Sequence, residues 1–543
     1  MWQTSRGILY LVIFSIVQQV WSQDNRYFIY FSDKTASPYS INAPEEFLSE
    51  ASIARRESQG IVMTTEDLPV NPSYVSDINA GGAVVYYRSR WLNGVLASMD
   101  SMVLETISSM SFVDSIAWIG KPKETLSKSR SSIEIPTNFD PPPYSTAGSS
   151  LQTAMLNVDK MHEDGYRGEG ITIAVLDGGF IGAQKFSPLS HVYENDRYLG
   201  GEDLTTYGDD PFKYSGHGTA VLSTIAAKSD SLIGTAFNAN FLLYVTEDVA
   251  SESPIEEYNW LVAAEMADSA GADILQSSVG YSVFNSPFKD YTQEDLDGET
   301  TLIAKAANYA YERGMIIVTS AGNEGNSSWR YVTAPADSRN VIAVGSVDDD
   351  YTKSGFSSVG PTADGRIKPD VVALGSRTTI MAGNGVIQQS SGTSYAAPLV
   401  AGLVAGLWQA NPDWSNQDVI NALKRTASRS LNPNNFYGHG VPNYEMAVLG
   451  NVLDVGDILS DKVTVYPNPF QGNKLFIDMS NQTLQEDVSV QIFDIEGSLV
   501  CDSIIKALGE EIVELKVEVR ENGVYVMTLT SSSFFKKIKL IKE

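Results

Sequence analysis

The chain has 543 residues, which as a rough guide is enough for about three or four domains of roughly 150 residues each. Hydrophobic residues make up 43% and aromatic residues 10% of it, which excludes a wholly disordered or collagen-like protein. The 66 acidic and 38 basic residues give a formal net charge of -28, and such a surface repels phosphate backbones and anionic lipid. We therefore expect no nucleic-acid partner and no attachment to membranes by charge.

The first 23 residues are typical of a secretory signal peptide. Arg6 precedes an apolar run from Ile8 to Val17, and Val20 and Ser22 occupy the small-residue positions before a cleavage site. The run is too short for an ordinary transmembrane helix, so an uncleaved membrane anchor is only the alternative interpretation.

Residues 24–122 are predicted to form a small α+β domain. It has strand-like segments at Tyr27–Tyr30, Gly82–Tyr87 and Ser115–Ile119, and helical stretches at Glu45–Ser58 and Val95–Ser109. Residues 123–150 are rich in Ser and Pro and show no apolar periodicity, which predicts a solvated linker.

Residues 151–450 alternate apolar strands with helices. The predicted strands are Ile171–Leu176, Phe241–Thr246, Ile274–Gln276, Met315–Thr319 and Val341–Val344, and the clearest helices are Ile255–Gly271 and Thr301–Gly314. This pattern predicts an α/β domain whose parallel sheet has helices on both faces, with its ligand site at the carboxyl ends of the strands.

Residues 460–543 are predicted to form a small all-β sandwich that ends in a basic tail, Lys536–Lys542. The predicted strands are Val463–Val465, Lys474–Ile477, Val488–Phe493, Ile512–Val517 and Val524–Leu529.

Four polar residues stand in contexts that suit catalysis by a nucleophilic hydroxyl. Asp177 ends an apolar strand and is followed by two glycines, and His217 lies between glycines where a helix opens. Ser394 precedes Pro398, which is best tolerated in a first turn, so the helix is predicted to start close to Ser394. That start puts the Ser394 hydroxyl and amide at the positive end of a helix dipole, and Asn323 offers an amide donor after another strand. Each feature alone also fits an ordinary turn, core histidine or helix cap, but together they supply nucleophile, base, orienting carboxylate and oxyanion donors.

With these elements the chain resembles the subtilisin-like (subtilase) serine peptidases. The signatures of that family are similar to Ala174–Gly179, His217–Thr219 and Gly392–Pro398, and the resemblance covers about Leu151 to Gly450. The chain departs from many members at Ala220, where they carry a second histidine, and at Leu222-Ser223, which replace the usual Ala-Gly.

The resemblance implies a secreted serine endopeptidase that works through an acyl-enzyme intermediate. Ser394 would be the nucleophile, His217 the base and then the acid, and Asp177 the orienting carboxylate, with Asn323 and the Ser394 amide as the oxyanion hole. The substrate-binding residues that it implies are Ser278, Val279, Gly280, Ser320, Ala321 and Gly322.

The flanking domains fit the same interpretation. Residues 24–122 resemble, more loosely, the inhibitory propeptide of these enzymes, which makes residues 123–150 the expected place of processing, with Lys128 and Arg130 as candidate cut sites. The C-terminal domain, with Val465–Phe470 and Gly523–Tyr525, resembles the sorting domain of the type IX secretion system of Bacteroidetes; a generic adhesive sandwich is the alternative. The expected partners are protein or peptide substrates, the chain's own propeptide and the secretion machinery. The expected location is secreted or cell-surface, reached through the periplasm.

No cofactor is expected for the chemistry. Calcium often stabilises subtilases, and Asp295, Asp297 and Glu299 could supply oxygen ligands, although a solvated acidic loop is the favoured interpretation of these residues. Two other functions compete with the endopeptidase. One is a degenerate peptidase that serves as a surface binding module, against which the intact set of four residues argues; the other is an esterase that uses the same nucleophile.

Overall fold

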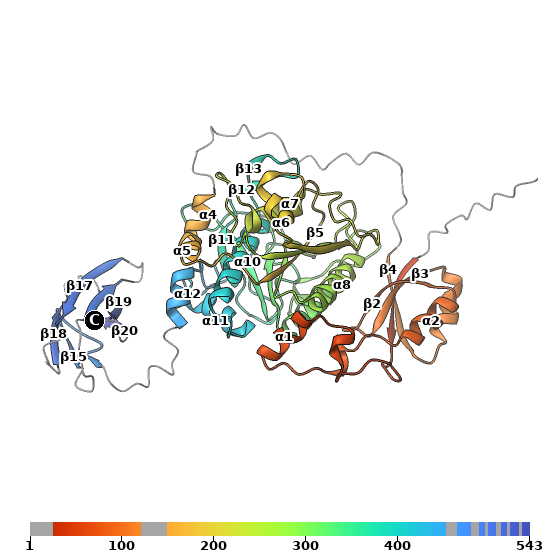
Figure 1. The fold of residues 1–543 in the computed structure, drawn as a ribbon, viewed down its shortest axis with the longest axis horizontal. Coiled ribbons are helices and arrows are strands. Elements are labelled where there is room, and N and C mark those ends of the chain that lie inside the picture. Colours follow the sequence, from red (N-terminus) through yellow and green to blue (C-terminus); the bar gives the residue numbers. More distant parts are fainter. Residues whose placement is uncertain are drawn as a thin grey trace, which may run out of the picture. The chain divides into compact units, whose positions relative to one another are not determined.

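The computed structural model describes residues 25–120, 149–451, 464–478, 488–494, 498–506, 512–517, 522–530 and 535–543 (Figure 1). The predicted signal peptide, almost all of the predicted linker, and Lys128 and Arg130 lie outside these residues. Contacts divide the chain into two compact units: Met1–Phe47, Met63–Thr137 and Ser253–Ile255 form one, and Leu48–Val62, Asn138–Glu252 and Glu256–Glu543 form the other. Within the described residues, no helix has both the length and the apolar character needed to cross a membrane.

The first unit contains a four-stranded antiparallel sheet with strand order β2-β3-β1-β4 and two short helices. Its core includes Ile29, Ile78 and Val95, all of them fully buried. The predicted α+β domain is therefore confirmed. Its elements are β1 (Asn25–Phe31), α2 (Pro72–Ala80), β2 (Val84–Ser89), β3 (Gly94–Met99), α3 (Leu104–Ser108) and β4 (Val113–Gly120).

The helix predicted over Val95–Ser109 is wrong in its first part, because Val95 to Met99 belong to strand β3. This strand pairs with β1 on one side and with β2 on the other. A strand in the middle of a sheet is buried among neighbours, so its apolar run shows no clear alternation that would separate it from a helix. The helical part, α3, starts only at Leu104.

The second unit is built around a seven-stranded sheet with strand order β11-β10-β9-β8-β5-β7-β6, in which every neighbouring pair is parallel. All six residues of β5 are buried, so both faces of the sheet are covered there, as the sequence predicted. The strands are β5 (Thr172–Asp177), β6 (Tyr198–Asp203), β7 (Asn240–Val245), β8 (Ile274–Ser277), β9 (Ile316–Ser320), β10 (Val341–Val347) and β11 (Val371–Leu374).

Helices α7 and α10 pack against each other and against the sheet, α7 on β5 and α10 on β8 to β11. Helix α10 is buried from Thr393 to Trp408 because nearly all of its residues are small or apolar. A β-hairpin of β12 (Thr378–Met381) and β13 (Ile387–Ser390) leads into it. The helices of this unit are α1 (Glu50–Ser58), α4 (Ser150–Met155), α5 (Val158–Glu163), α6 (Ser187–Glu194), α7 (His217–Ala226), α8 (Ile255–Ala270), α9 (Leu302–Glu312), α10 (Thr393–Ala410), α11 (Asn416–Thr426) and α12 (Tyr444–Asn451).

The C-terminal region forms two antiparallel sheets, with strand orders β14-β15-β18 and β17-β16-β19-β20. Phe470, Leu475, Val490 and Met527 are fully buried in the core that they share, which confirms the predicted sandwich. The sequence predicted a basic tail at the end, and the structure makes it the edge strand β20. The strands are β14 (Thr464–Tyr466), β15 (Lys474–Asp478), β16 (Val488–Phe493), β17 (Leu499–Ile505), β18 (Ile512–Lys516), β19 (Gly523–Thr530) and β20 (Phe535–Lys542).

Candidate active site

Each predicted catalytic residue lies at or just beyond the end of a helix or strand. Asp177 is the last residue of β5, His217 the first residue of α7, and Ser394 the second residue of α10. Asn323 follows the end of β9 by three positions. The carboxyl edge of a parallel sheet is where such a fold leaves room for a ligand.

Asp177 and His217 form a hydrogen-bonded pair. The Nδ1 atom of His217 lies 2.9 Å from both carboxylate oxygens of Asp177. The Asp177 side chain is fully buried, and its Oδ1 also accepts the backbone NH of Gly178 at 2.7 Å. Burial lowers the pKa of His217, but the charge and the hydrogen bond of Asp177 outweigh it, so that the pKa is raised. The carboxylate favours the proton on Nδ1, which leaves Nε2 as the basic nitrogen.

The first two turns of α10 hold the backbone of Ser394 in an unusual way. The helix begins at Thr393, so the predicted start is confirmed, but Pro398 is its sixth residue and lies beyond the first turn. Since proline has no NH, it gives no hydrogen bond to the carbonyl of Ser394 four residues earlier. The Ser278 hydroxyl donates to that carbonyl at 2.9 Å instead, and the Ser394 hydroxyl lies 3.4 Å from the Ser278 carbonyl.

Asn323 is oriented by the same helix end. Its side-chain oxygen accepts the backbone NH of Thr393 at 2.9 Å and the Thr393 hydroxyl at 3.0 Å. A Cβ atom on Gly392 would lie 3.8 Å from Nδ2 of Asn323 and 3.7 Å from the backbone nitrogen of Ser394. The two predicted oxyanion donors therefore lie beside Gly392 within one small volume.

The ring of Tyr395, the third residue of α10, lies beside the imidazole of His217. The ring centroids of His217 and Tyr395 are 5.8 Å apart. Because Tyr395 directly follows Ser394, the imidazole lies beside the turn that carries the predicted nucleophile. Burial raises the pKa of Tyr395, and the nearby negative charge of Asp177 adds to the effect.

The two predicted substrate-binding segments, 278–280 and 320–322, approach each other around Thr333. A Cβ on Gly280 would lie 2.2 Å from the Thr333 hydroxyl oxygen, and one on Gly322 would lie 3.0 Å from it. Gly322 also has a φ of +103°, a conformation that other residues rarely adopt. Ser320 and Ala321 are buried, and Val279 is half-buried.

Three residues of this region were not identified from the sequence. Thr333 lies between the two binding segments, Thr393 orients Asn323, and Gln276 donates to the Ser278 hydroxyl at 2.7 Å. Thr333 and Gln276 lie outside the three signatures; Thr393 lies within the signature Gly392–Pro398, but its contact with Asn323 could not be predicted from that motif. Ser223, one of the departures from the family pattern, accepts the backbone NH of Met381 at 2.8 Å, so it ties α7 to β12.

Glu247 is a further carboxylate near the Asp177–His217 pair. A Cβ on Gly178, the residue after Asp177, would lie 3.7 Å from Cβ of Glu247. Its side-chain Oε1 accepts the hydroxyls of Tyr281 at 2.6 Å and Thr246 at 2.7 Å. Burial and, less strongly, the charge of Asp177 raise the pKa of Glu247 to about 7 despite these hydrogen bonds.

The free energy of unfolding of the wild type is expected to fall as pH rises from 5 to 8, and we expect this fall to be smaller in Glu247→Gln. Because the pKa is raised on folding, the folded chain keeps a proton from about pH 4.5 to pH 7 that the unfolded chain has released, so the unfolding free energy falls as pH rises through this window. Glutamine keeps the acceptor without the charge, and removes about 1 to 2 kcal/mol of this loss once solvent screening is allowed for.

Thermal unfolding of the wild type, Glu247→Gln and the exposed control Glu163→Gln at the two pH values measures the effect. An equal pH dependence in all three would contradict the raised pKa.

The three residues considered for calcium hold protein donors instead. Asp295 accepts the NH and hydroxyl of Thr292 at 2.7 and 2.8 Å. Asp297 accepts the NH groups of Glu299 and Thr300, and the Glu299 carboxylate pairs with Arg339 at 2.8 Å. Each carboxylate is thus engaged by neighbouring groups of the chain, and these contacts do not favour a shared calcium site.

Comparison with known proteins finds three family matches along the chain. Residues 168–440 match the subtilase family, residues 26–134 match the peptidase S8 propeptide domain of Bacteroidota, and residues 464–543 match a secretion system C-terminal sorting domain. The chain therefore belongs to the subtilase family. It is a serine-type endopeptidase with a propeptide domain, and its sorting domain identifies it as a secreted or cell-surface protein. The alternative of a generic adhesive sandwich at the C-terminus falls away.

Individual relatives give the same result. Over 288 residues, which are 53% of this chain and 93% of the relative, the sequence is 32% identical to subtilisin BL of Lederbergia lenta. It is 30% identical to subtilisin E of Bacillus subtilis strain 168 over 299 residues, 54% of this chain and 70% of the relative. The crystal structure of the epidermin leader peptide processing serine protease (EpiP) from Staphylococcus aureus shares the fold, with a TM-score of 0.55 and 19% identity over 79% of this chain and 99% of that one.

Proposed function

We propose that the protein hydrolyses internal peptide bonds with a triad of Asp177, His217 and Ser394. The observation that carries this proposal is the 2.9 Å contact of His217 Nδ1 with both oxygens of buried Asp177. It sets the tautomer that a general base needs, and the imidazole lies beside the turn that carries Ser394.

In the first half of the reaction, His217 Nε2 takes the hydroxyl proton of Ser394 while the oxygen attacks the carbonyl carbon of the scissile bond. The tetrahedral oxyanion would accept hydrogen bonds from Nδ2 of Asn323 and from the Ser394 amide. His217 then gives its proton to the leaving amine, the carbon–nitrogen bond breaks, and an acyl ester on Ser394 remains. Water, deprotonated by the same imidazole, hydrolyses this ester and restores the serine.

We expect Asn323→Ala to lower kcat by about 10²- to 10³-fold with little change in KM, the order established for loss of this donor in a subtilisin. The bond that is lost forms fully only with the charged intermediate, so it contributes little to binding of the substrate. Steady-state kinetics on a chromogenic peptide measures this, with Asn326→Ala, a nearby asparagine, as the control. A change confined to KM would contradict the role.

Substrate is proposed to bind as an extended strand between segments 278–280 and 320–322. Both segments approach Thr333; segment 278–280 follows β8, and segment 320–322 begins with the last residue of β9, so their backbone groups are suited to pair with a peptide. The side chain before the cut would enter the space between them. Protein and peptide substrates are therefore the expected partners in the cleft.

The remaining parts of the chain are proposed to control this activity. The domain at 24–122 would inhibit and assist folding until the chain is processed in residues 123–150, and the domain at 460–543 would engage the type IX secretion machinery after passage through the periplasm. The domains matched at 26–134 and 464–543 support these assignments.

Labelling with a serine-directed phosphonate tests the proposal. We expect one equivalent of label on Ser394, found by peptide mass mapping, and none in Ser394→Ala. An unlabelled but folded wild type would favour the binding-module interpretation. Label and activity on esters with none on peptides would favour the esterase.

A further inference from the structure

Helix α1 lies within the matched propeptide segment but packs with the peptidase unit. The propeptide match spans residues 26–134, yet Leu48–Val62 belongs to the same compact unit as the central sheet. The segments on either side of it, Met1–Phe47 and Met63–Thr137, belong to the other unit. Segment Leu48–Val62, which contains α1, is therefore part of the peptidase unit, although in the sequence it lies within the propeptide domain.

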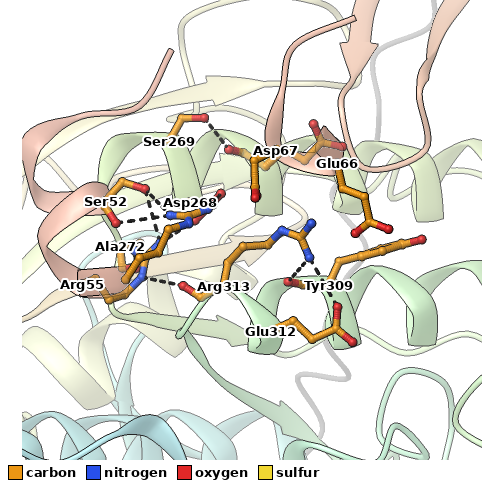
Figure 2. Close-up of polar contacts among 12 residues, drawn as sticks. Ser52, Arg55, Glu66, Asp67, Asp268, Ser269, Ala272, Tyr309, Glu312 and Arg313 are labelled. Atoms are coloured by element: carbon orange, nitrogen blue, oxygen red, sulfur yellow. Dashed lines mark hydrogen bonds and ion pairs between the residues drawn. The ribbon is translucent and has the colours of Figure 1, made fainter. Parts of the chain in front are cut away.

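Arg55 of α1 binds the C-terminal ends of two peptidase helices at once (Figure 2). Its guanidinium donates to the carbonyl of Ala272, just beyond the end of α8, and at 3.1 Å to the carbonyl of Arg313, just beyond the end of α9. Helix C-termini leave carbonyls without intrahelical partners and carry partial negative charge, so a cation is stabilised there. The same guanidinium forms an ion pair with Asp268.

Arg56 completes a buried cluster of two guanidinium groups around one carboxylate. It pairs with the other oxygen of Asp268 at 2.8 Å and donates to the Ser52 hydroxyl at 2.6 Å. The side chains of Arg55, Arg56 and Asp268 are at most 3% exposed. Removing one partner from such a cluster leaves a buried charge uncompensated, which is costly.

The fit around this cluster is close. A Cβ on Gly271, which follows α8, would lie 2.5 Å from Cβ of Ala51, so only glycine lets α1 approach there. The backbone NH of Ser49 donates to the carbonyl of Ser269 at 2.9 Å. At the other end of the segment, Gln59 donates to the carbonyl of Gly314 and accepts the backbone NH of Asn416, both at 2.9 Å.

This contact lies at the opposite edge of the sheet from the catalytic residues. Ala272 precedes β8 and Gly314 precedes β9, whereas Ser278 and Asn323 follow the same two strands. Parallel strands of four or five residues separate the two edges by about 13 to 17 Å. Binding of α1 is therefore physically separate from occupation of the cleft.

We propose that α1 is an anchor that keeps the propeptide bound to the peptidase unit after the chain has been cut in residues 123–150, and that Asp268 is the group on which retention depends. This inference rests on the proposed role of the propeptide. A cut chain would then remain associated until α1 withdraws its two arginines from Asp268, whatever the state of the cleft. Arginine is required because a lysine ammonium cannot reach two carbonyls and a carboxylate together.

The test uses the full chain with Ser394→Ala, to prevent self-cleavage, and a site for an external protease inserted within residues 123–150. After cutting, size-exclusion chromatography follows release of the N-terminal fragment. We expect the fragment to stay bound, and release to become about 10²- to 10³-fold faster in Asp268→Asn, the effect of leaving buried charge unpaired. Arg55→Lys should release at least about tenfold faster, and Glu57→Gln, an exposed charge change on the same helix, should match the parent.

Release rates of Asp268→Asn and Arg55→Lys within threefold of the parent would overturn the anchor, as would immediate release from the parent itself. Circular dichroism of the uncut chain shows whether Asp268→Asn folds. If it does not, the release rates of Arg55→Lys and Arg56→Lys test the anchor in its place. Phosphonate labelling of the Ser394 protein keeps the two proposals distinguishable. Retention of the fragment that depends on Asp268, without labelling of Ser394, would support the anchor and contradict the peptidase mechanism. Labelling of Ser394, without retention that depends on Asp268, would support the mechanism and contradict the anchor.

Discussion

Replacement of Ser394 by alanine is expected to lower kcat for peptide hydrolysis by about 10⁶-fold, the order established for a subtilisin that lacks its nucleophile. The hydroxyl oxygen of Ser394 is the atom that forms the covalent bond to the acyl group. The Ser278 hydroxyl cannot take its place, because it donates a hydrogen bond to the Ser394 carbonyl. Residual hydrolysis would come from substrate binding and oxyanion stabilisation alone.

Active-site titration and steady-state kinetics on a chromogenic peptide measure this effect. Ser391→Ala is the matched control, since Ser391 is an exposed serine three positions earlier whose hydroxyl accepts the backbone NH of Arg377. A Ser394→Ala enzyme that keeps more than about 1% of the activity, after contaminating protease is excluded by inhibitor, would contradict the assigned nucleophile.

Asp177→Asn is expected to lower kcat by about 10⁴-fold while the fold is kept. The asparagine amide is nearly the same size, but its NH2 group would donate to Nδ1 of His217 and move the imidazole proton to Nε2, the nitrogen that must act as base. The charge that raises the pKa of His217 would also be lost, so the acid limb of the pH–rate profile should shift to lower pH.

The pH dependence of kcat/KM for both proteins gives this result directly. Since His217 must be neutral to act as base, its raised pKa predicts that wild-type activity falls as pH drops through a value above the ordinary pKa of histidine. If the acid limb of the kcat/KM profile is unchanged in Asp177→Asn, that limb reports the titration of a group other than His217. Circular dichroism and thermal unfolding serve as the control for folding.

The sequence was sufficient for the parts of this protein that rest on short-range rules. Alternating apolar strands and helices predicted the parallel sheet, and the start of α10 was predicted close to Ser394. Local signals failed where burial removes periodicity, as in β3, whose run from Val95 to Met99 reads equally well as a helix.

The triad itself could be proposed from the sequence because each residue stands in a short, distinctive context. The contacts of its supporting residues could not be predicted in this way, although the family resemblance implied Ser278 as a substrate-binding residue. The Ser278 hydroxyl donates to the carbonyl of Ser394, 116 positions away in the sequence, in place of the NH that Pro398 lacks. Thr333 lies between two binding segments, a position that its neighbours in the sequence do not suggest. Such roles depend on distances between distant segments, which no local pattern encodes.

From the sequence alone followed the family resemblance, the domain order and the four residues proposed for chemistry, since the chemistry needs particular side chains and these are written in the chain. Only the tertiary structure decided that α1 belongs with the peptidase unit, because a buried ion pair between residues more than 200 positions apart forms only where folding brings them together. Arg55 and Arg56 look in the sequence like ordinary charges on an exposed helix face. Burial against Asp268 and two helix ends gives them a role.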